Sequence, residues 1–171
     1  MSFGRLLYLA AIAAAAALLL RLWLFEGIYA ASASMEPTLP VGVSVVLDKV
    51  TYKLRDPRRG EIVVFTSPVP PQKDMIKRVI AVGGDTVEIR DKRVYVNAAP
   101  LDEPYVRHTR GEEKLEGDTL EPRTVPEGHL FVLGDNRDES NDSSVWKDPA
   151  TGERVLFLPL SSLRGKIRGF Y

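Results

Sequence analysis

The chain has 171 residues, which is enough for one domain of ordinary size with its own core. Lysine plus arginine and aspartate plus glutamate both number 23, so no net charge draws the chain to nucleic acid or to an anionic surface. Cysteine is absent, which excludes disulfides, thiolate metal sites and a cysteine nucleophile. The two histidines, His108 and His129, have no second histidine or obvious carboxylate at ligand spacing, so we expect no metal and no cofactor.

An apolar run, LLYLAAIAAAAALLLRLWLF, occupies residues 6–25. As a helix it would be roughly 30 Å long, which matches the hydrocarbon core of a bilayer. Arg21 and Trp23 lie near its end, where arginine reaches the headgroups and tryptophan acts as an interfacial anchor. The alternative is a cleavable signal peptide, because Arg5 gives a short basic region and residues 31–33 resemble a cleavage site. Since a signal-peptide core has only about 7–15 residues, we favour a retained transmembrane anchor.

The positive-inside rule gives this anchor an orientation. It places residues 1–5 in the cytoplasm and residues 26–171 outside, as one extracytoplasmic domain on a single-pass protein of the plasma (inner) membrane.

Two serines one residue apart follow the apolar run, in Ala31-Ser32-Ala33-Ser34-Met35-Glu36-Pro37-Thr38. Serine-rich segments after an anchor are commonly linkers. The other interpretation is that Ser34 is a nucleophile, which requires a base brought to it from elsewhere in the chain. This stretch alone leaves both open.

The rest of the chain alternates between β-branched runs and turn signals, with no amphipathic helix of usual length and no internal repeat. We expect a mainly β fold, with one antiparallel sheet after the anchor, and a hairpin across Arg90-Asp91-Lys92-Arg93. Residues 98–124, which are polar and contain Gly, Pro and mixed charges, are predicted to be a surface excursion without an assignable role. The predicted strands are 43–47, 61–65, 75–82, 86–89, 94–96, 129–133, 155–158 and 166–170.

Lys77 and Arg78 stand inside an otherwise apolar predicted strand. Their side chains point to opposite faces, so at least one is buried if either face is packed. Two solvated cations at a sheet edge are the simpler interpretation. A buried lysine is the alternative: desolvation that lowers its pKa to roughly 7–8 makes it a useful base.

An acidic loop, residues 134–143, follows the predicted strand 129–133. Its Asp, Asn, Ser and Gly residues are typical of a structured turn. A calcium loop fits poorly, because no glycine follows the third ligand position and no bidentate glutamate is present. A third interpretation is that these polar groups orient a catalytic pair brought to them by the fold.

Four blocks, in this order, resemble bacterial type I signal peptidases, the membrane-anchored serine proteases that remove signal peptides from exported proteins. With the apolar run they cover nearly the whole chain except about residues 98–124. Any one block is a weak signal, whereas four in family order are specific. The blocks are Ser34-Met35-Glu36-Pro37-Thr38-Leu39, Arg59-Gly60-Glu61-Ile62-Val63-Val64-Phe65, Ile76-Lys77-Arg78-Val79 with Gly83-Gly84-Asp85, and Gly134-Asp135-Asn136-Arg137-Asp138 with Ser140, Asp142 and Ser143.

The resemblance implies a Ser/Lys dyad without histidine, in which Ser34 is the nucleophile and Lys77 the general base. It further implies that the Ser34 backbone N–H and the Ser32 hydroxyl stabilise the oxyanion. Signal peptides of exported pre-proteins and the lipid bilayer are the implied partners. A lysine as base is typical of the prokaryotic form.

The resemblance also implies supporting residues around the dyad. Ser140 would orient the lysine amine, Asp135 would pair with Arg78, and Asp142 would support the same loop. One position departs from the family pattern: Ser144 stands where an arginine often follows the D-S pair. An ion pair between that arginine and Asp142 is therefore not expected here.

Small pockets would set the substrate preference. Ile28, Ala30 and Ile76 are expected to line shallow pockets for alanine-like side chains one and three residues before the cut. The extended substrate would add as a strand beside residues 74–77.

Two other functions remain open. One is another Ser/Lys maturation protease, although self-cleaving repressors carry a DNA-binding domain and lack such an anchor. The other is an inactive membrane-tethered β module that binds exported peptides. It predicts a lost nucleophile or base, yet Ser34 and Lys77 are both present.

Overall fold

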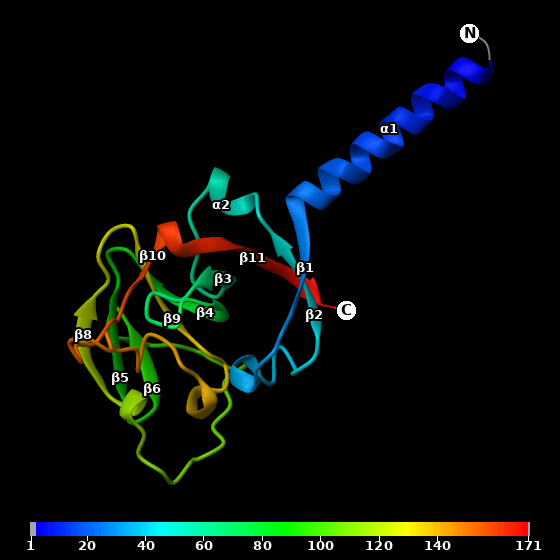
Figure 1. The fold of residues 1–171 in the computed structure, drawn as a ribbon. Helices are drawn as coiled ribbons and strands as arrows, with labels where there is room; N and C mark the ends of the chain where they lie inside the picture. The colour runs from blue at the N-terminus through cyan, green and yellow to red at the C-terminus, as the bar shows by residue number, and fades with distance from the viewer. Residues whose placement is uncertain (1–2, 171) are drawn as a thin grey trace.

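The computed structural model describes residues 3–170, with the side chains of 18–23 and 170 left out of the description. A long helix, α1 (Phe3–Leu24), precedes a β-rich domain (Figure 1). Its strands are β1 (Phe25–Tyr29), β2 (Ser44–Asp48), β3 (Ile62–Thr66), β4 (Asp74–Val82), β5 (Thr86–Arg90), β6 (Arg93–Val96), β7 (Ala99–Pro100), β8 (Leu120–Thr124), β9 (His129–Leu133), β10 (Leu158–Pro159) and β11 (Leu163–Phe170). Its short helical segments are α2 (Thr51–Leu54), η1 (Ala33–Met35), η2 (Glu116–Asp118), η3 (Arg137–Glu139) and η4 (Leu160–Ser162).

The strands form two sheets, so the prediction of one sheet was wrong. The larger has the order β1-β2-β11-β3-β4-β9-β10 and the smaller β7-β6-β5-β8, and neighbouring strands within each run antiparallel. The physical reason is that β4 buries both of its faces. Val79 packs into one hydrophobic cluster, while Ile80 and Ala81 join another that includes Val87 and Ile89 of the second sheet. A single sheet would leave that second apolar face in water.

The predicted hairpin is confirmed, since β5 pairs with β6 from Arg90 opposite Arg93. Its two-residue turn places Asp91 and Lys92 at φ values of 44° and 69°, the conformation that a tight antiparallel hairpin favours. The strand predicted over 155–158 was wrong for most of its length, because only Leu158–Pro159 pairs with β9. The apolar residues before Leu158 are half-buried against the two cores without joining a ladder.

Strands β1, β7 and β8 were not predicted. The sequence of β1, Phe-Glu-Gly-Ile-Tyr, lacks a clear strand pattern, and the pairing of all its residues with β2 fixes its conformation. Strands β7 and β8 both lie in the predicted surface excursion, 98–124, and complete the smaller sheet.

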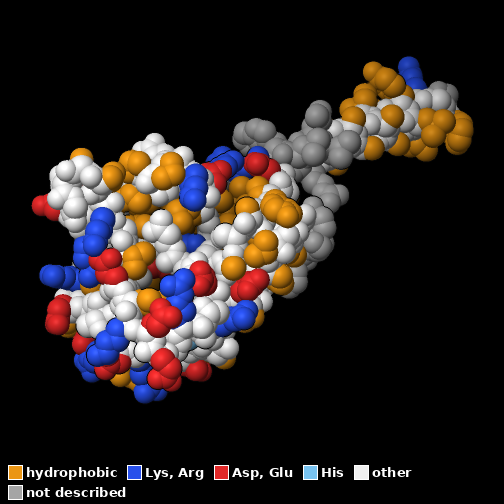
Figure 2. Space-filling view, turned by 60° about the horizontal axis from the view of Figure 1, so that its bottom comes forward, with side chains coloured by type: hydrophobic (Ala, Val, Ile, Leu, Met, Phe, Trp, Pro, Cys, Tyr) orange, Lys and Arg blue, Asp and Glu red, His pale blue; other side chains and the backbone are white. Residues whose placement is uncertain are grey.

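Residues 3–17 of α1 have exposed and mostly apolar side chains (Figure 2), whereas Leu24 at its end is half-buried. The helix ends at Leu24, and Phe25, the last residue of the predicted anchor, belongs to β1. Within the part of the chain that the structure describes, no helix reaches the length and apolar character of a membrane span. The transmembrane segment predicted over residues 6–25 therefore stays a prediction.

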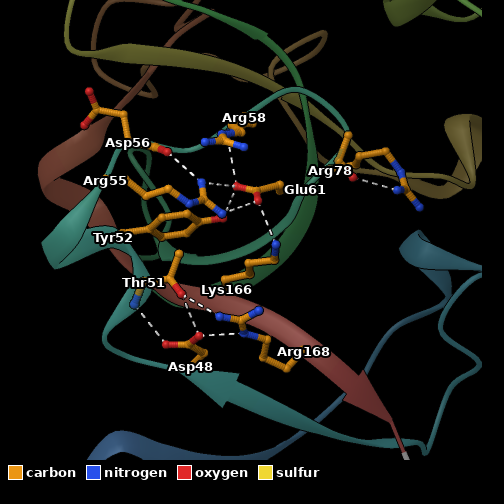
Figure 3. Close-up of polar contacts among 11 residues, drawn as sticks. Asp48, Thr51, Tyr52, Arg55, Asp56, Arg58, Glu61, Arg78, Lys166 and Arg168 are labelled. Atoms are coloured by element: carbon orange, nitrogen blue, oxygen red, sulfur yellow. Dashed lines mark hydrogen bonds and ion pairs between the residues drawn. The ribbon is translucent and has the colours of Figure 1, made fainter.

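Two carboxylates, the buried Asp48 and the half-buried Glu61, bind β11 to the neighbouring strands (Figure 3). Asp48 accepts hydrogen bonds from the backbone and hydroxyl of Thr51 and from Arg168, and Glu61 accepts from Arg55 and from Lys166 at 2.7 Å. Burial opposes ionisation of both groups, but these donors outweigh it. They lower the pKa of Glu61 to about 2 and hold that of Asp48 well below its usual range.

Replacing Glu61 with glutamine is predicted to lower the free energy of unfolding by about 1–3 kcal/mol at neutral pH, because Arg55 and Lys166 lose their anion. Since the pKa of Glu61 is depressed on folding, its contribution is complete above about 4.5 and is lost as the pH falls towards 2. The wild-type protein should therefore lose more stability over this pH range than Glu61→Gln does. Urea unfolding at neutral and acidic pH measures the difference.

The matched control is Glu121→Gln, which neutralises an exposed carboxylate on β8. It should leave both the neutral-pH stability and its acid dependence unchanged. Parallel pH curves for the wild type and Glu61→Gln would contradict the assignment.

Candidate active site

Ser34 and Lys77 meet although 43 residues separate them in the chain. Ser34 is in the short η1 helix after β1, and Lys77 is on β4. The Lys77 Nζ lies 2.7 Å from the Ser34 Oγ, and both residues are buried, with exposed fractions of 2% and 6%. The Ser32 Oγ lies 3.1 Å from the Ser34 Oγ. The structure thus brings the sequence-predicted nucleophile, base and one oxyanion donor into direct contact.

Burial changes the proton affinity of the lysine. It lowers the pKa of Lys77 to about 8, because a charged amine loses hydration in the protein interior. The carboxylates of Asp142 and Asp135 oppose this effect, whereas the cation of Lys73 adds to it. With this pKa roughly a tenth of the Lys77 amine is unprotonated at pH 7, far more than for a solvated lysine, and it lies within hydrogen-bond distance of a hydroxyl.

Asp142 organises the acidic loop beside this pair. Its carboxylate accepts hydrogen bonds from the Gly134 N–H at 2.9 Å and from the Ser140 hydroxyl at 2.5 Å. Ser144, which stands where the family often has arginine, donates to it from both its backbone N–H and its hydroxyl, at 3.0 and 2.7 Å. The hydroxyl of Ser144 thus supplies a donor to Asp142 at the position where the resemblance implies an arginine. The Ser140 hydroxyl, predicted to orient the lysine, donates to Asp142 here.

Arg78 and Asp135 form the predicted ion pair. The guanidinium donates from Nε and from one terminal nitrogen to the two carboxylate oxygens, at 2.8 and 2.6 Å. The Thr38 hydroxyl donates to the same carboxylate at 2.5 Å. The turn that contains the predicted nucleophile, residues 33–36, is called the nucleophile turn. Because Thr38 follows this turn and Arg78 follows Lys77, the Asp135 carboxylate holds both Ser34 and Lys77 to the acidic loop.

The acidic loop also contacts the nucleophile turn directly. The Asn136 backbone N–H donates to the Ser34 carbonyl at 3.1 Å, and its side-chain nitrogen lies 3.3 Å from the Ala33 carbonyl. A β-carbon on Gly134 would lie only 2.5 Å from the Ser34 carbonyl oxygen and would clash with the Ser140 side chain. The glycine is needed here because two backbone segments pass one another without room for a methyl group.

A groove of about 330 Å³ opens beside the dyad. Of the three predicted pocket residues, Ala30 and Ile76 line it. Ile28 does not, and it packs against the core between β2 and η1. Strand alternation alone would place Ile28 and Ala30 on the same face, but β1 ends at Tyr29, so Ala30 lies beyond the strand and does not follow its alternation. Lining residues that sequence reasoning missed are Tyr29, Met35, Leu39, Met75, Glu139 and Asn141.

The two histidines are separate, as expected, but His108 does meet a carboxylate. Its Nδ1 lies 3.2 Å from the Asp138 Oδ1, a pairing that sequence spacing did not indicate. Lys92 shares the same oxygen at 3.2 Å. Among the described residues, no three or more histidine, aspartate or glutamate side chains gather as a possible metal site.

Gly134→Ala is predicted to lower the free energy of unfolding by about 1–3 kcal/mol, because the new methyl group forces apart the acidic loop and the nucleophile turn. Urea unfolding measures the change. Gly111→Ala is the control, since a β-carbon there meets no atom within 4 Å. Equal stabilities of Gly134→Ala and the control would show that the close approach at Gly134 is not needed.

Comparisons with known proteins place this chain in a family. A family model described as "Signal peptidase, peptidase S26" matches residues 3–171. Signal peptidase I of Pseudomonas aeruginosa is 36% identical over 186 residues, which cover 87% of this chain and 65% of that protein. Probable signal peptidase I-2 of Synechocystis is 41% identical over 133 residues, covering 74% and 58%. The chain thus spans less than two thirds of the length of these two relatives.

Two further matches are also to proteins named signal peptidase I. Signal peptidase I of Bacillus licheniformis is 39% identical over 166 residues, which cover 90% of this chain and 87% of that relative. A crystal structure of a signal peptidase I from Enterococcus faecalis superposes with a TM-score of 0.49 and 33% identity, covering 66% of this chain and 97% of that one. The extent of the family match, together with the similarity to the Bacillus protein over most of both chains, shows that the chain belongs to the signal peptidase family, peptidase S26.

Proposed function

We propose that this chain is a membrane-anchored serine endopeptidase that removes signal peptides from exported pre-proteins. The observation that carries the proposal is the buried Lys77 amine, 2.7 Å from the Ser34 hydroxyl and with a pKa lowered to about 8. Burial of a lysine amine costs stability, which points to a use for it. In a chain of this family, activation of a serine is the use that fits the contact.

In the proposed mechanism, the neutral Lys77 amine takes the proton of the Ser34 hydroxyl as its oxygen attacks the scissile carbonyl. The resulting ammonium returns that proton to the leaving amine, which releases the new N-terminus and leaves an acyl ester on Ser34. Water then attacks the ester with Lys77 again as base. The second attack frees the signal peptide and restores the dyad.

The oxyanion formed in each attack needs hydrogen-bond donors. We assign this role to the Ser32 hydroxyl and to the Ser34 backbone N–H. The 3.1 Å contact between the two serine hydroxyls supports the first assignment, because it holds Ser32 beside the reacting atom. The second is supported by the position of Ser34 in the first turn of η1, where backbone N–H groups have no partner within the helix. Ser140 and Asp142 are proposed to support the lysine through the acidic loop.

The edge of β4 is suited to bind an extended peptide. Strand β9 pairs with β4 only from Arg78 onwards, so residues 74–77 have β3 on one side and the groove on the other. The Lys73 carbonyl accepts from Ser67 of the β3 side, and Val79 donates back to Glu61. Since alternate residues of an antiparallel ladder bond the same neighbour, the backbone groups of Asp74 and Ile76 face the groove. They are the proposed partners of an added substrate strand.

Alanine-like side chains fit the pockets along this edge. Ala30 and Ile76 line the groove with Met35 and Leu39, so its lining near the dyad is largely apolar. Ile76 is partly buried and Ala30 is 5% exposed, which leaves little depth for a large substrate side chain. We propose that these pockets admit small residues one and three positions before the cut.

The exposed apolar surface of α1 supports a membrane anchor. A helix with apolar side chains on every described face needs a non-aqueous environment or a partner to cover it. We propose that it holds the domain at the plasma membrane, with residues 1–5 cytoplasmic and the catalytic domain outside. The nucleophile would then lie a few residues from the lipid surface, where a membrane-bound signal peptide presents its cleavage site.

Ser34→Ala and Lys77→Ala are each predicted to abolish cleavage of a precursor with an alanine-x-alanine site, assayed in detergent or lipid. The wild-type rate should rise with pH through a midpoint near 8, because only the neutral form of Lys77 accepts the proton. Ser161→Ala and Lys114→Ala, which change exposed residues, are the matched controls and should retain full activity. Peptide binding without cleavage by the wild type would favour a binding module instead.

Ser32→Ala is predicted to lower kcat by about 100- to 1000-fold and to leave substrate binding intact, because loss of one oxyanion donor affects the transition state. Steady-state kinetics with the same precursor separate kcat from KM. A loss confined to KM would contradict the assignment.

Ile76→Ala is predicted to widen the substrate preference, so that precursors with larger residues before the cut become substrates. Competition between precursors with alanine and with valine at the site measures the ratio of kcat/KM. Ile28→Ala is the control, since Ile28 faces the core and not the groove. An unchanged ratio in Ile76→Ala would remove Ile76 from the pocket.

A further inference from the structure

Residues 103–110, part of the predicted surface excursion, lie against the acidic loop. The Arg107 N–H donates to the Asp135 carbonyl at 2.8 Å, and the Arg107 carbonyl accepts from the Arg137 N–H at 3.0 Å. Further along, the Arg110 N–H donates to the Asp138 carboxylate at 2.6 Å. The segment therefore runs beside the loop as an added, parallel backbone pair.

Tyr105 covers the ion pair that holds the dyad. Its ring stacks on the Arg78 guanidinium, with 3.8 Å between the central carbon of the guanidinium and the ring centroid. Arg78 is largely buried, and a desolvated cation over an aromatic face is held much more firmly than an exposed one. The guanidinium is thus fixed in its plane by Asp135 and on its face by Tyr105.

The same tyrosine joins a closed ring of contacts. Its hydroxyl donates to Glu103 at 3.1 Å, and burial together with the Glu103 carboxylate raises the pKa of Tyr105, so the phenol stays protonated. Glu103 pairs with Arg137, whose Nε donates to the Gly134 carbonyl at 3.2 Å. Both side chains of this second ion pair are about nine-tenths buried.

This segment also reaches the nucleophile turn from the outside. Arg107 pairs with Glu36, two residues after Ser34, at 3.1 Å. One short stretch therefore touches the strand that carries the lysine, the acidic loop and the turn that carries the serine. The polar composition that made residues 98–124 look like a solvated excursion supplies these contacts.

We propose that residues 103–107 act as a positioning clamp for the dyad, and that the stack of Tyr105 on Arg78 is the contact by which the clamp fixes Lys77 against Ser34. The inference rests on the proposed function. Tyr105 is a positioning residue, because it contacts neither Lys77 nor Ser34 in any hydrogen bond that the structure holds. It acts through Arg78, the neighbour of Lys77 on β4.

The expected result of loosening the clamp follows from the surroundings of Lys77. If β4 shifts around Arg78, water reaches the Lys77 amine and weakens the effect of burial, while the attraction of Asp142 and Asp135 and the repulsion of Lys73 remain. We expect Tyr105→Leu to move the pH midpoint of kcat upwards by about one pH unit. The kcat at neutral pH should fall by about tenfold, with KM unchanged.

Two variants make the test specific. Tyr105→Phe keeps the stack and loses only the hydroxyl, so it should restore the wild-type midpoint. Tyr95→Leu removes a similar stack, on Arg90 at 4.4 Å, from the smaller sheet. It should lower thermal stability without moving the midpoint. All rates are referred to the folded fraction, measured by thermal unfolding of the full-length protein in the same detergent.

An unmoved midpoint and unchanged kcat in Tyr105→Leu would overturn the proposal and leave Tyr105 a packing residue. The pH titration of the Lys77 amine by ¹⁵N NMR gives a readout that needs no turnover. If the wild type fails to cleave any precursor, the proposed function is wrong. The clamp is then tested by the NMR titration alone: a higher Lys77 midpoint in Tyr105→Leu supports it, and an unchanged midpoint overturns it.

Discussion

The burial of one amine governs the structure around it. Lys77 is 2% exposed, and its Nζ touches the Ser34 hydroxyl at 2.7 Å. Burial removes the ammonium from water and so disfavours its protonated form. The same burial that costs folding stability therefore lowers the pKa of Lys77 and makes the amine a base near neutral pH. The apolar residues of β4 and η1 that bury the amine, together with the nearby carboxylates of Asp142 and Asp135, set the size of this pKa shift.

The acidic loop limits how far burial lowers the pKa of Lys77. Asp142 and Asp135 lie near enough to raise the pKa of Lys77 against burial, and neither bonds the amine in the structure. Both are occupied by other donors, Asp142 by Gly134, Ser140 and Ser144 and Asp135 by Arg78 and Thr38. Their charges are therefore fixed in place before any substrate binds, as a preorganised site requires.

Local patterns in the sequence were enough to predict most strands and the hairpin, whereas the contact between Ser34 and Lys77 was expected only from the family resemblance. The pair formed by Arg78 and Asp135 was predicted from the family resemblance and is present. Three features could not be predicted from local patterns because they depend on contacts between residues far apart in the sequence. They are the second sheet, strand β1 and the stack of Tyr105 on Arg78. A tyrosine in a polar stretch of mixed charge carries no periodic signal, and only the fold shows that it covers a largely buried arginine.

The most direct test of the central claim is to identify the covalent intermediate. A precursor with an alanine-x-alanine site is mixed with the protein, the reaction is quenched in acid, and the digested protein is analysed by mass spectrometry. The account predicts an acyl adduct on the peptide that contains Ser34, absent from Ser34→Ala and from Lys77→Ala. Turnover of the precursor with an adduct on another residue, or undiminished turnover by Ser34→Ala, would contradict it.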